Sequence, residues 1–362
     1  MDCLSDARRI IDNADKEMAR LFEQRMDAVK TIAEYKKING IPIDDPFRES
    51  EMIKRNTVLV DNDEYKSYYV SFLKNNIDIS KKMQHKLLEG MTVAYSGVEG
   101  AFANITAKKI FPYANCVPFS DFKSAYTAVE NGQCDCVLLP VENSHNGDVG
   151  NVLDLAFFGS LYINGIYESD IVQNLLAKKE ATIEDIKTVI SHPQALGQCA
   201  SFIKKHDFKT EEAVNTAVAA KCVAQSSKND IAAIGSVEAA EKFGLQILSA
   251  HINESNTNTT RFAVFSRSIR TPSPKDDRFI MLFTVKNAAG SLGRAVSVIG
   301  QHGFNLRAIK SRPTKMLIWD YFFYVEGEGN INSEKGKEML KELNECCSNL
   351  KIAGFFEREL HV

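Results

Sequence analysis

The sequence has no long apolar run and no excess of charge of one sign. Its 362 residues carry 44 Lys and Arg against 47 Asp and Glu, a formal net charge of -3. That balance gives no electrostatic reason to expect nucleic acid or an anionic membrane as a partner. No segment reaches the roughly 20 apolar residues of a membrane-spanning helix. The first residues carry acids where a secretory signal carries bases, so we expect a cytoplasmic protein.

Paired cysteine motifs are also lacking. None of the eight cysteines forms a Cys-x-x-Cys pair. Zinc sites use two such pairs, or one pair with spaced histidines, so the sequence predicts no metal site. Free, mostly buried thiols are the better interpretation. The composition is otherwise that of an ordinary globular protein, and the length suffices for two or three domains.

The first part of the chain, residues 1–89, has a helical pattern throughout. Apolar side chains recur at alternating spacings of three and four over the first 35 residues, which predicts a long amphipathic helix with a coiled-coil-like seam. Asn39-Gly40 ends this helix. Asp45-Pro46 opens a second one, because Asp45 can cap it and proline suits the first helical position. A third helix is expected from about residue 64 to 88.

Two further regions follow, which makes the chain a multidomain protein. In residues 91–267 short strands alternate with helices, a pattern that predicts two α/β lobes with a cleft between them and largely parallel sheets. Residues 268–278, with two prolines and mixed charge, are interpreted as a linker. Residues 279–362 show the order βαββαβ of a ferredoxin-like module.

A set of polar residues interrupts the apolar pattern of the helical region. Arg25 falls on the apolar seam, and a buried guanidinium needs an anionic partner. Lys36, eleven residues later, lies within about 20° of the same helix face. The remaining members are Arg8, Asp45, Arg48, Glu49, Ser80 and Gln84. Together they suit a small dianion with hydroxyl and ether oxygens, although solvated surface charges explain Arg8, Arg48 or Glu49 taken singly.

Polar clusters lie at strand ends of the central region. The sequences are Glu142-Asn143-Ser144 with Gly147, Ser191-His192-Pro193-Gln194, and Asn258-Thr259-Thr260-Arg261-Phe262. Such clusters are typical of the ligand cleft of an open α/β sheet. Taken singly, each is also explained by turn and capping chemistry. His192 has no second ligand at metal-binding spacing, and a structural role is as good an interpretation as a catalytic one.

The polar set of the helical region resembles the all-helical class of chorismate mutase. The resemblance implies that Arg8, Arg25 and Arg48 hold the two carboxylates of chorismate. It implies that Lys36 and Gln84 donate to the ether oxygen, while Glu49 holds the ring hydroxyl; Asp45 and Ser80 complete the motif. The rearrangement is pericyclic, so catalysis consists of binding the reactive conformer and stabilising that oxygen. In this family Arg8 reaches the site of the other subunit, which implies a homodimer or a higher homo-oligomer.

Residues 91 to about 267 resemble prephenate dehydratase. The matching positions are Glu142, Asn143, Ser144, Gly147, His192, Gln194, Thr216 with the Ala217-Val218-Ala219-Ala220 that follows, Asn258, Thr260, Arg261 and Phe262. The resemblance implies that Thr260 donates or positions the proton for the leaving hydroxide, that Arg261 lies near the substrate's carboxylates, and that no cofactor is needed. Ala101 and Ala103 replace hydroxyl residues of the family's first turn, a change that is expected to weaken prephenate binding.

The C-terminal module resembles the ACT domain, which binds phenylalanine at a subunit interface. The implied effector-binding residues are Gly290, Ser291, Leu292, Asn305, Leu306, Ser311 and Arg312. Ser291 and Lys310 depart from the family pattern, and Lys310 puts a cation where the family has a carboxylate. A different effector, insensitivity to effectors, or a plain dimerisation module are the alternatives.

Together these resemblances predict a bifunctional enzyme that converts chorismate to prephenate and prephenate to phenylpyruvate, with feedback by phenylalanine. Two alternatives remain at this point. One is a catalytically silent sensor built from a ligand-binding α/β pair and an effector module. The other is a dehydratase whose helical region only dimerises. Acceptance of arogenate as a second substrate is also open.

Overall fold

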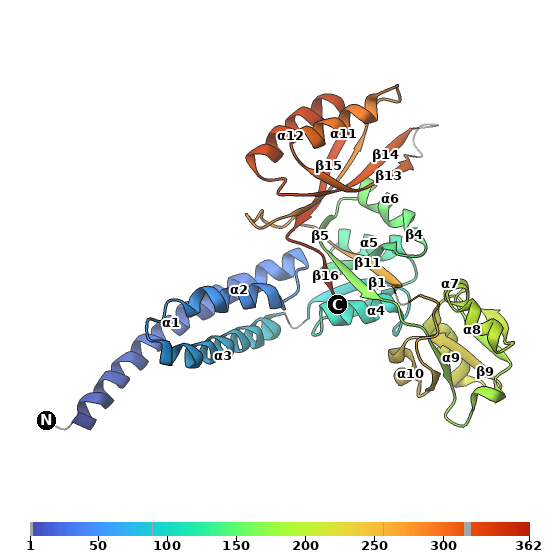
Figure 1. Cartoon of the computed structure of the whole chain (residues 1–362), viewed down its shortest axis with the longest axis horizontal. Coiled ribbons are helices and arrows are strands. Elements are labelled where there is room, and N and C mark those ends of the chain that lie inside the picture. The colour runs from blue at the N-terminus through green and yellow to red at the C-terminus, as the bar shows by residue number, and fades with distance from the viewer. Residues whose placement is uncertain (1–2, 89, 256, 315–319) are drawn as a thin grey trace. The chain divides into compact units, whose positions relative to one another are not determined.

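The computed structural model describes residues 3–88, 90–255, 257–314 and 320–362 (Figure 1). They form two compact units, Met1–Met91 and Thr92–Val362. Among the described helices, none combines the length and the apolar character that crossing a membrane requires.

The first unit consists of the three predicted helices. They are α1 (Cys3–Asn39), α2 (Pro46–Thr57) and α3 (Asp63–Leu87). Gly40, at φ 62°, follows the end of α1, and the Asp45 side chain caps α2 by accepting from the Arg48 backbone N–H at 3.0 Å. The second half of α1 packs on α3 through Val29, Ala33 and other buried apolar side chains.

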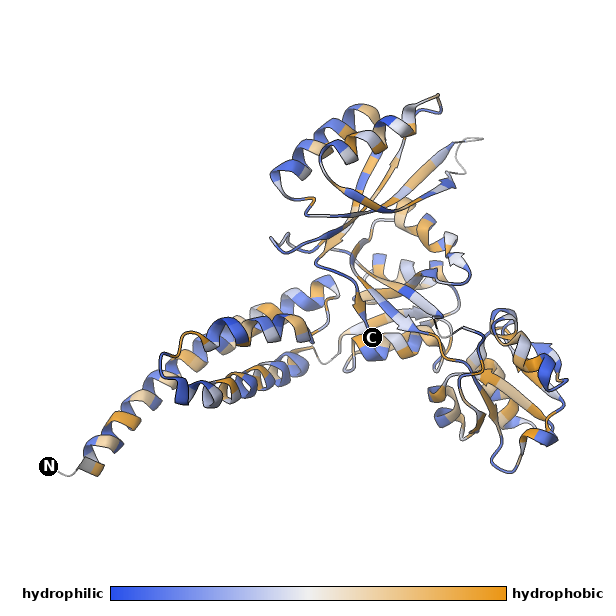
Figure 2. Ribbon diagram, viewed as in Figure 1, coloured by the Kyte–Doolittle hydropathy of each residue, from blue (hydrophilic) through white to orange (hydrophobic). Residues whose placement is uncertain are grey.

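The first half of α1 extends beyond the other two helices (Figure 1), and hydrophobic residues recur along it among hydrophilic ones (Figure 2). Its exposed apolar side chains include Leu4, Ile10, Ile11, Met18, Leu21 and Phe22. An isolated chain in water gains nothing from exposing such a stripe, since the hydrophobic effect favours its burial.

The second unit begins with a seven-stranded sheet in the order β16-β5-β11-β3-β1-β2, with β4 beside β3. The strands are β1 (Thr92–Ser96), β2 (Asn115–Phe119), β3 (Cys136–Asn143), β4 (Gly147–Asp148), β5 (Tyr162–Asp170), β11 (Thr259–Ser266) and β16 (Leu360–His361). Its helices are α4 (Phe102–Ile110), α5 (Phe122–Glu130) and α6 (Gly150–Phe158). Apolar side chains of β3, β5, β11, α5 and α6 form its core.

A second lobe is inserted between β5 and β11. Its five-stranded sheet has the order β10-β6-β9-β7-β8 and a core of its own. The strands are β6 (Asn174–Ala177), β7 (Thr188–Ser191), β8 (Lys209–Glu212), β9 (Ile231–Gly235) and β10 (Gln246–Ser249). The helices are the one-turn η1 (Ile183–Asp185), α7 (Pro193–Gln198), α8 (Ala200–Lys205), α9 (Thr216–Gln225) and α10 (Val237–Phe243).

The prediction of largely parallel sheets was wrong, because both sheets are mixed. Strand β1 is parallel to β2 and β3, but β11 is antiparallel to both β3 and β5. In the second lobe β6 runs antiparallel to β9 and β10. The reason is the chain path: β5 leaves the first lobe and β11 returns to it, so the two strands lie side by side in opposite directions.

The C-terminal module has the predicted βαββαβ order. Its elements are β12 (Arg278–Thr284), α11 (Ser291–Gln301), β13 (Asn305–Pro313), β14 (Tyr321–Glu328), α12 (Glu334–Cys346) and β15 (Ser348–Phe356). The antiparallel sheet has the order β13-β14-β12-β15. Its helices contact each other, while side chains such as Phe322 join the core of the first lobe, where Phe322 stacks on Phe157 at 4.2 Å.

Two segments between these parts differ from their interpretation in the sequence. Residues 268–277 contain neither helix nor strand, as expected of a linker, but they are held in place: Asn164 bonds both the Ser268 carbonyl and the Arg270 N–H. Arg278, placed in the linker, begins β12. The end of the chain leaves the module, because β16 pairs in parallel with β5 in the first lobe. The region 279–362 is therefore not a single module up to its last residue.

Candidate active sites

The helical unit brings Arg25, Ser80 and Gln84 together between α1 and α3. The Arg25 guanidinium donates to Ser80 Oγ, which itself donates to the Asn76 carbonyl at 2.7 Å. Gln84 lies one turn further along α3 and is buried. Within the described residues its Oε1 has no hydrogen-bond partner. A buried amide oxygen without a partner is costly, so the Gln84 amide is expected to gain a polar partner when a ligand binds.

Lys36 is buried at the end of α1, with 8% of its surface exposed. Its ammonium donates to the Ile43 carbonyl at 2.7 Å. Burial, with the nearby charge of Arg48 as the next cause, lowers the pKa of Lys36 to about 8. A lysine with this pKa is still mostly protonated at neutral pH, and it is an effective donor to an oxygen that gains negative charge.

The start of α2 carries the remaining charges of this site. Asp45 is the helix cap, Arg48 is exposed, and the Glu49 carboxylate is 2.7 Å from Lys81 Nζ. Lys81, which also pairs with Asp44 at 2.9 Å, was missed in the sequence because it reads as an ordinary surface lysine of α3.

Arg8 is not near these residues within one chain. It is exposed on α1 and lies seventeen residues before Arg25, about 25 Å away along a straight helix at 1.5 Å per residue. Its predicted place in the site therefore requires the α1 helix of a second subunit.

In the α/β unit, the ends of β3 and β11 bring Asn143, Asn258 and Thr260 into contact. Asn143 Nδ2 donates to Thr260 Oγ1 at 2.9 Å and to Asn258 Oδ1 at 3.0 Å. Asn143 Oδ1 accepts from the backbone N–H groups of His145 and Asn146. The Asn143 side chain is thereby fixed by its own loop. Because Thr260 Oγ1 accepts from Asn143, its hydroxyl hydrogen is directed elsewhere and is available for a ligand.

Neighbouring residues fix this pair of strand ends. The Ser144 hydroxyl donates to the Thr257 carbonyl at 2.9 Å and accepts from the Thr259 N–H at 3.0 Å. Gly147, at φ 72°, follows the turn of residues 144–146 as the first residue of β4, a position that suits glycine because that backbone region is strained for other residues. The predicted loop 142–147 and the predicted segment 258–262 therefore do lie together.

Gln198 is a residue of this cluster that the sequence reasoning missed. It ends α7 in the second lobe, and its Oε1 accepts from Asn258 Nδ2 at 3.0 Å. Its Nε2 is buried and, within the described residues, has no partner. The signal in the sequence was its position four residues after Gln194, on the same face of a helix.

The other predicted residues have local roles. His192 Nδ1 caps α7 by accepting from the Gln194 N–H at 3.2 Å, while Gln194 itself is exposed. Thr216 is buried at the start of α9, and Phe262 is in the core. In the turn before α4, Ala101 gives no side-chain cap, and Asn104 next to Ala103 accepts from the Gly100 N–H at 3.1 Å.

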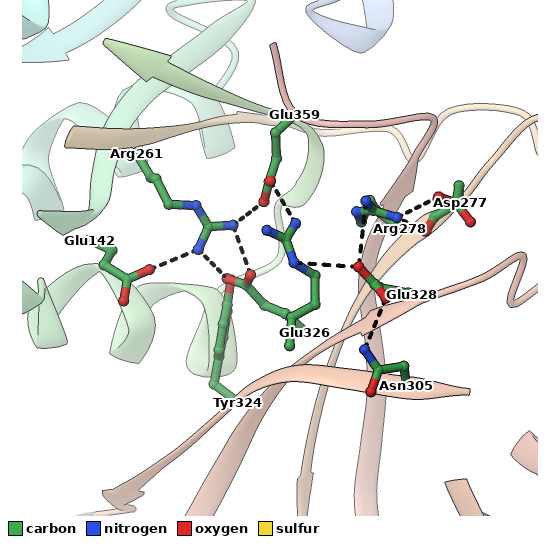
Figure 3. Close-up of polar contacts among 10 residues, drawn as sticks. Glu142, Arg261, Asp277, Arg278, Asn305, Tyr324, Glu326, Glu328 and Glu359 are labelled. Atoms are coloured by element: carbon green, nitrogen blue, oxygen red, sulfur yellow. Dashed lines mark hydrogen bonds and ion pairs between the residues drawn. The ribbon is translucent and has the colours of Figure 1, made fainter. Parts of the chain in front are cut away.

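Arg261 faces away from Thr260, because consecutive strand residues point to opposite faces of a sheet. Figure 3 shows its guanidinium among three carboxylates. It bonds Glu142 at 2.8 Å, Glu326 at 2.8 and 3.2 Å, and Glu359. Burial alone would lower the pKa of Arg261, but these carboxylates, Glu326 foremost, raise it. The guanidinium that the resemblance assigns to substrate carboxylates is thus bonded to carboxylates of the protein.

The residues predicted to bind an effector divide between two surroundings. Gly290, at φ 82°, precedes α11, and Ser291 is the first residue of that helix. Leu292 and Leu306 pack on the module core, Asn305 donates to Glu328 at 2.9 Å, and Ser311 is exposed on β13. Arg312 instead binds Asp154 of α6 through two bonds of 2.6 and 3.0 Å. Lys310 also points away from the module, to Glu142 and Asp148.

Within the described residues, no group of three or more His, Cys, Asp or Glu side chains is arranged to hold a metal ion.

Comparison with known proteins assigns both units. The chorismate mutase type II family matches residues 7–85, and the prephenate dehydratase family matches residues 93–270. The bifunctional chorismate mutase/prephenate dehydratase of Aquifex aeolicus is 32% identical over 368 residues, which cover 99% of each chain.

Solved structures share the fold of the second unit. One, described as GqqA, a novel type of quorum quenching acylase, is 26% identical with a TM-score of 0.68; the match covers 75% of this chain and 98% of that one. A prephenate dehydratase of Arthrobacter aurescens, solved in complex with L-Phe, is 24% identical with the same TM-score; the match covers 74% and 90% of the two chains.

The helical unit and the α/β unit thus define a two-part enzyme, a chorismate mutase followed by a prephenate dehydratase. The chain belongs to the family of bifunctional chorismate mutase/prephenate dehydratases. It catalyses two successive steps of phenylalanine biosynthesis: the rearrangement of chorismate to prephenate, and the dehydration and decarboxylation of prephenate to phenylpyruvate.

Proposed function

We propose that chorismate binds in the helical unit between Arg25, Lys36 and Gln84. The two carboxylates of chorismate are held by Arg25 and Arg48 of one chain and by Arg8 of a second chain. Glu49, oriented by Lys81, accepts from the ring hydroxyl. Binding selects the compact conformer in which the enolpyruvyl group lies over the ring, and this removes most of the entropic part of the barrier.

The ether oxygen gains negative charge as its bond to the ring breaks. Lys36 donates to it from a buried position, where an ionic hydrogen bond is stronger than in water. Gln84 donates to the same oxygen through Nε2, which requires its amide to turn from the weak 3.4 Å bond to the Ser80 carbonyl. No group of the protein has to form a covalent bond or move a proton.

We infer a homodimer from the helical unit. Arg8 is about 25 Å from Arg25 along α1, and the same half of α1 carries exposed apolar side chains. A second copy that covers this stripe would bury it and bring its own Arg8 to the site. Mixing an Arg8→Ala chain with an Arg25→Ala chain tests this, because mixed dimers would contain one intact site and regain activity.

In the α/β unit we propose Thr260 as the donor to the leaving hydroxide of prephenate. Asn143 holds the Thr260 oxygen as an acceptor, which directs the hydroxyl hydrogen outward and makes it a stronger donor through hydrogen-bond cooperativity. Gln198 Nε2, which has no partner within the described residues, is a second donor for a substrate oxygen. Loss of carbon dioxide and formation of the aromatic ring supply the driving force, so a weak acid in a fixed position suffices.

We further propose that the βαββαβ module is an ACT domain that senses phenylalanine and that the protein acts in the cytoplasm. The Gly290–Leu292 turn of the module, together with Asn305 and Leu306 at the start of β13, forms the proposed effector site. The shared fold with a prephenate dehydratase solved in complex with L-Phe supports this choice of effector. Arg312 belongs to the contact with Asp154 and not to the effector site.

The observations that carry the site assignment are the Asn143–Thr260 bond with the buried Gln198 Nε2, which has no partner within the described residues, and the buried ammonium of Lys36 in the helical unit. The test is to give the purified protein chorismate and follow prephenate and phenylpyruvate over time, with and without phenylalanine. Prephenate followed by phenylpyruvate is expected, with slower dehydration when phenylalanine is present. An unchanged time course with phenylalanine would contradict the proposed feedback.

A further inference from the structure

Beyond the residues at the site, a buried ion-pair network joins the C-terminal module to the strand ends that carry Asn143 and Thr260. Its centre is the cross-strand pair of Arg261 on β11 and Glu142 on β3 (Figure 3). Each member of this pair is adjacent in sequence to a proposed site residue: Glu142 precedes Asn143, and Arg261 follows Thr260.

Two residues of the C-terminal module, Glu326 and Lys310, form ion pairs with Arg261 and Glu142. Glu326 on β14 binds both terminal nitrogens of Arg261 at 2.8 and 3.2 Å. Lys310 on β13 bonds Glu142 at 3.1 Å and Asp148 at 2.6 Å. Both module side chains are largely enclosed, with 7% of Glu326 and 10% of Lys310 exposed. The module therefore places one charge on each of the two strands.

The contacts of Lys310 join the two sides of the turn between β3 and β4, which holds the Asn143 side chain. Glu142 and Asp148 are paired across β3 and β4, and the turn between them contains the backbone N–H groups that hold Asn143 Oδ1. One ammonium bound to both carboxylates ties the two stems of this turn together. The Tyr324 hydroxyl steadies the arrangement by donating to Glu326 at 2.8 Å, and its ring lies 5.7 Å from Lys310 Nζ.

We propose that Lys310 and Glu326 are positioning residues for the dehydratase reaction. Acting through Glu142 and Arg261, they fix the ends of β3 and β11, so that Asn143 keeps Thr260 in the orientation in which it donates. This inference rests on the proposed role of Thr260. The inference also explains why position 310 is a lysine. The positive charge of Lys310 neutralises the carboxylates of Glu142 and Asp148 in the first lobe, and the side chain does not face an effector.

A buried ion-pair network adds little to the free energy of unfolding, but it can hold side chains in a fixed arrangement, because its members bond in few ways. Loss of the Lys310 charge leaves two neighbouring carboxylates without their shared cation, so the turn is expected to open. Displacement of a catalytic group by about 1 Å costs up to about 100-fold in rate. The loss should appear in kcat, because the proton donor acts in the transition state, and less in KM.

The test compares Lys310→Met with Lys351→Met in the full-length protein. Lys351 is a matched control, since it also joins the module to the first lobe, donating to the carbonyls of Ala156 and Gly159 in and after α6, away from the strand ends. We expect Lys310→Met to lower kcat for prephenate by about 10- to 100-fold with KM changed less than about threefold. Lys310→Arg should recover most of the rate, and Lys351→Met should stay within about twofold.

The thermal transition of each variant shows whether it is folded, and its mutase activity shows whether the helical unit is intact. If Lys310→Met does not fold, Glu326→Gln carries the same test, because it keeps the side-chain volume and removes only the charge. The inference is overturned if kcat falls no more in the tested variant than in Lys351→Met, or if only KM changes. The proposed role of Thr260 fails separately, if Thr260→Val retains the wild-type kcat.

Discussion

The two active sites of this chain differ in what their positively charged side chains are bonded to. In the helical unit the three cations proposed to meet the substrate from within one chain have no carboxylate bonded to them among the described residues: Lys36 bonds a carbonyl, Arg25 a hydroxyl, and Arg48 is exposed, while Lys81 pairs with Asp44 and Glu49. In the α/β unit the cations are bonded to carboxylates, as Arg261 is, and the site itself consists of neutral amides and a hydroxyl. The cations of the helical site suit a dianionic substrate, and the neutral groups of the α/β site orient a proton donor.

This difference follows from the two reactions. A pericyclic rearrangement needs its substrate held in one conformer and one oxygen stabilised, so unpaired positive charge is the useful resource. Dehydration with decarboxylation is driven by formation of an aromatic ring and needs a directed proton. There, fixed geometry counts for more than charge, and the structure supplies it through the bonds of Asn143.

The largest expected effect comes from removing the buried cation of the helical site. Lys36→Ala should lower mutase kcat roughly 100- to 1,000-fold or more, the loss typical of a donor to a developing oxyanion. Dehydratase activity on added prephenate should be unchanged. Steady-state assays of both reactions on one preparation provide the measurement. Unchanged chorismate turnover would show that Lys36 does not donate to the ether oxygen.

The corresponding change in the α/β site removes one hydroxyl and no charge. Thr260→Val keeps the shape of the side chain and should lower dehydratase kcat by about 100-fold or more, because general-acid groups contribute at least that much. Thr260→Ser, which keeps the hydroxyl, serves as the matched control and should retain much of the rate. Equal activity of the valine and serine variants would show that the Thr260 hydroxyl is not the proton donor.

The charged site should also respond to pH, and the neutral one should not. The pKa of Lys36 is lowered to about 8 by burial, so the protonated donor is lost as pH rises through this value. Mutase kcat/KM should then fall by about tenfold per pH unit above 8. Dehydratase kcat/KM should not follow this curve. A mutase profile that stays flat to pH 9.5 would contradict the account of Lys36.

Much of this could be predicted from the sequence, and the limits have physical reasons. Arg25 was identifiable because a guanidinium on an apolar seam is unusual, and the cap at Asp45 and the βαββαβ order follow from local patterns. The mixed sheets were not predictable, because strand direction depends on where a chain returns. Strand β16, with two residues, is too short to leave a pattern.

The ion-pair network around Arg261 could not be predicted from the sequence either, because its members lie far apart along the chain. Arg261 lies 65 residues from Glu326 and 98 residues from Glu359, and no periodicity links such positions. The resemblance to prephenate dehydratase implied that Arg261 lies near the substrate's carboxylates. The folded chain supplies carboxylates of its own, and only the tertiary structure shows that they are close enough to do so.

The smallest expected effect concerns the turn before α4. Ala101 occupies the cap position of this helix without a side-chain hydrogen bond, so Ala101→Ser should add a cap and stabilise the fold by about 1 kcal/mol. The KM for prephenate should fall slightly if the turn contacts the substrate. Thermal unfolding and dehydratase kinetics measure the two effects, with Ala103→Ser, one residue inside α4, as the comparison. A decrease in stability for Ala101→Ser would contradict the cap assignment.

The most direct test of two separate and differently built sites is to mix the Lys36→Ala and Thr260→Val proteins and supply chorismate. Alone, the first should convert chorismate at least about 100-fold more slowly than the wild type, and the second should accumulate prephenate. The mixture should form phenylpyruvate after a lag in which free prephenate appears. If Lys36→Ala alone, or Thr260→Val alone, forms phenylpyruvate from chorismate at the wild-type rate, the assignment of the two sites is wrong.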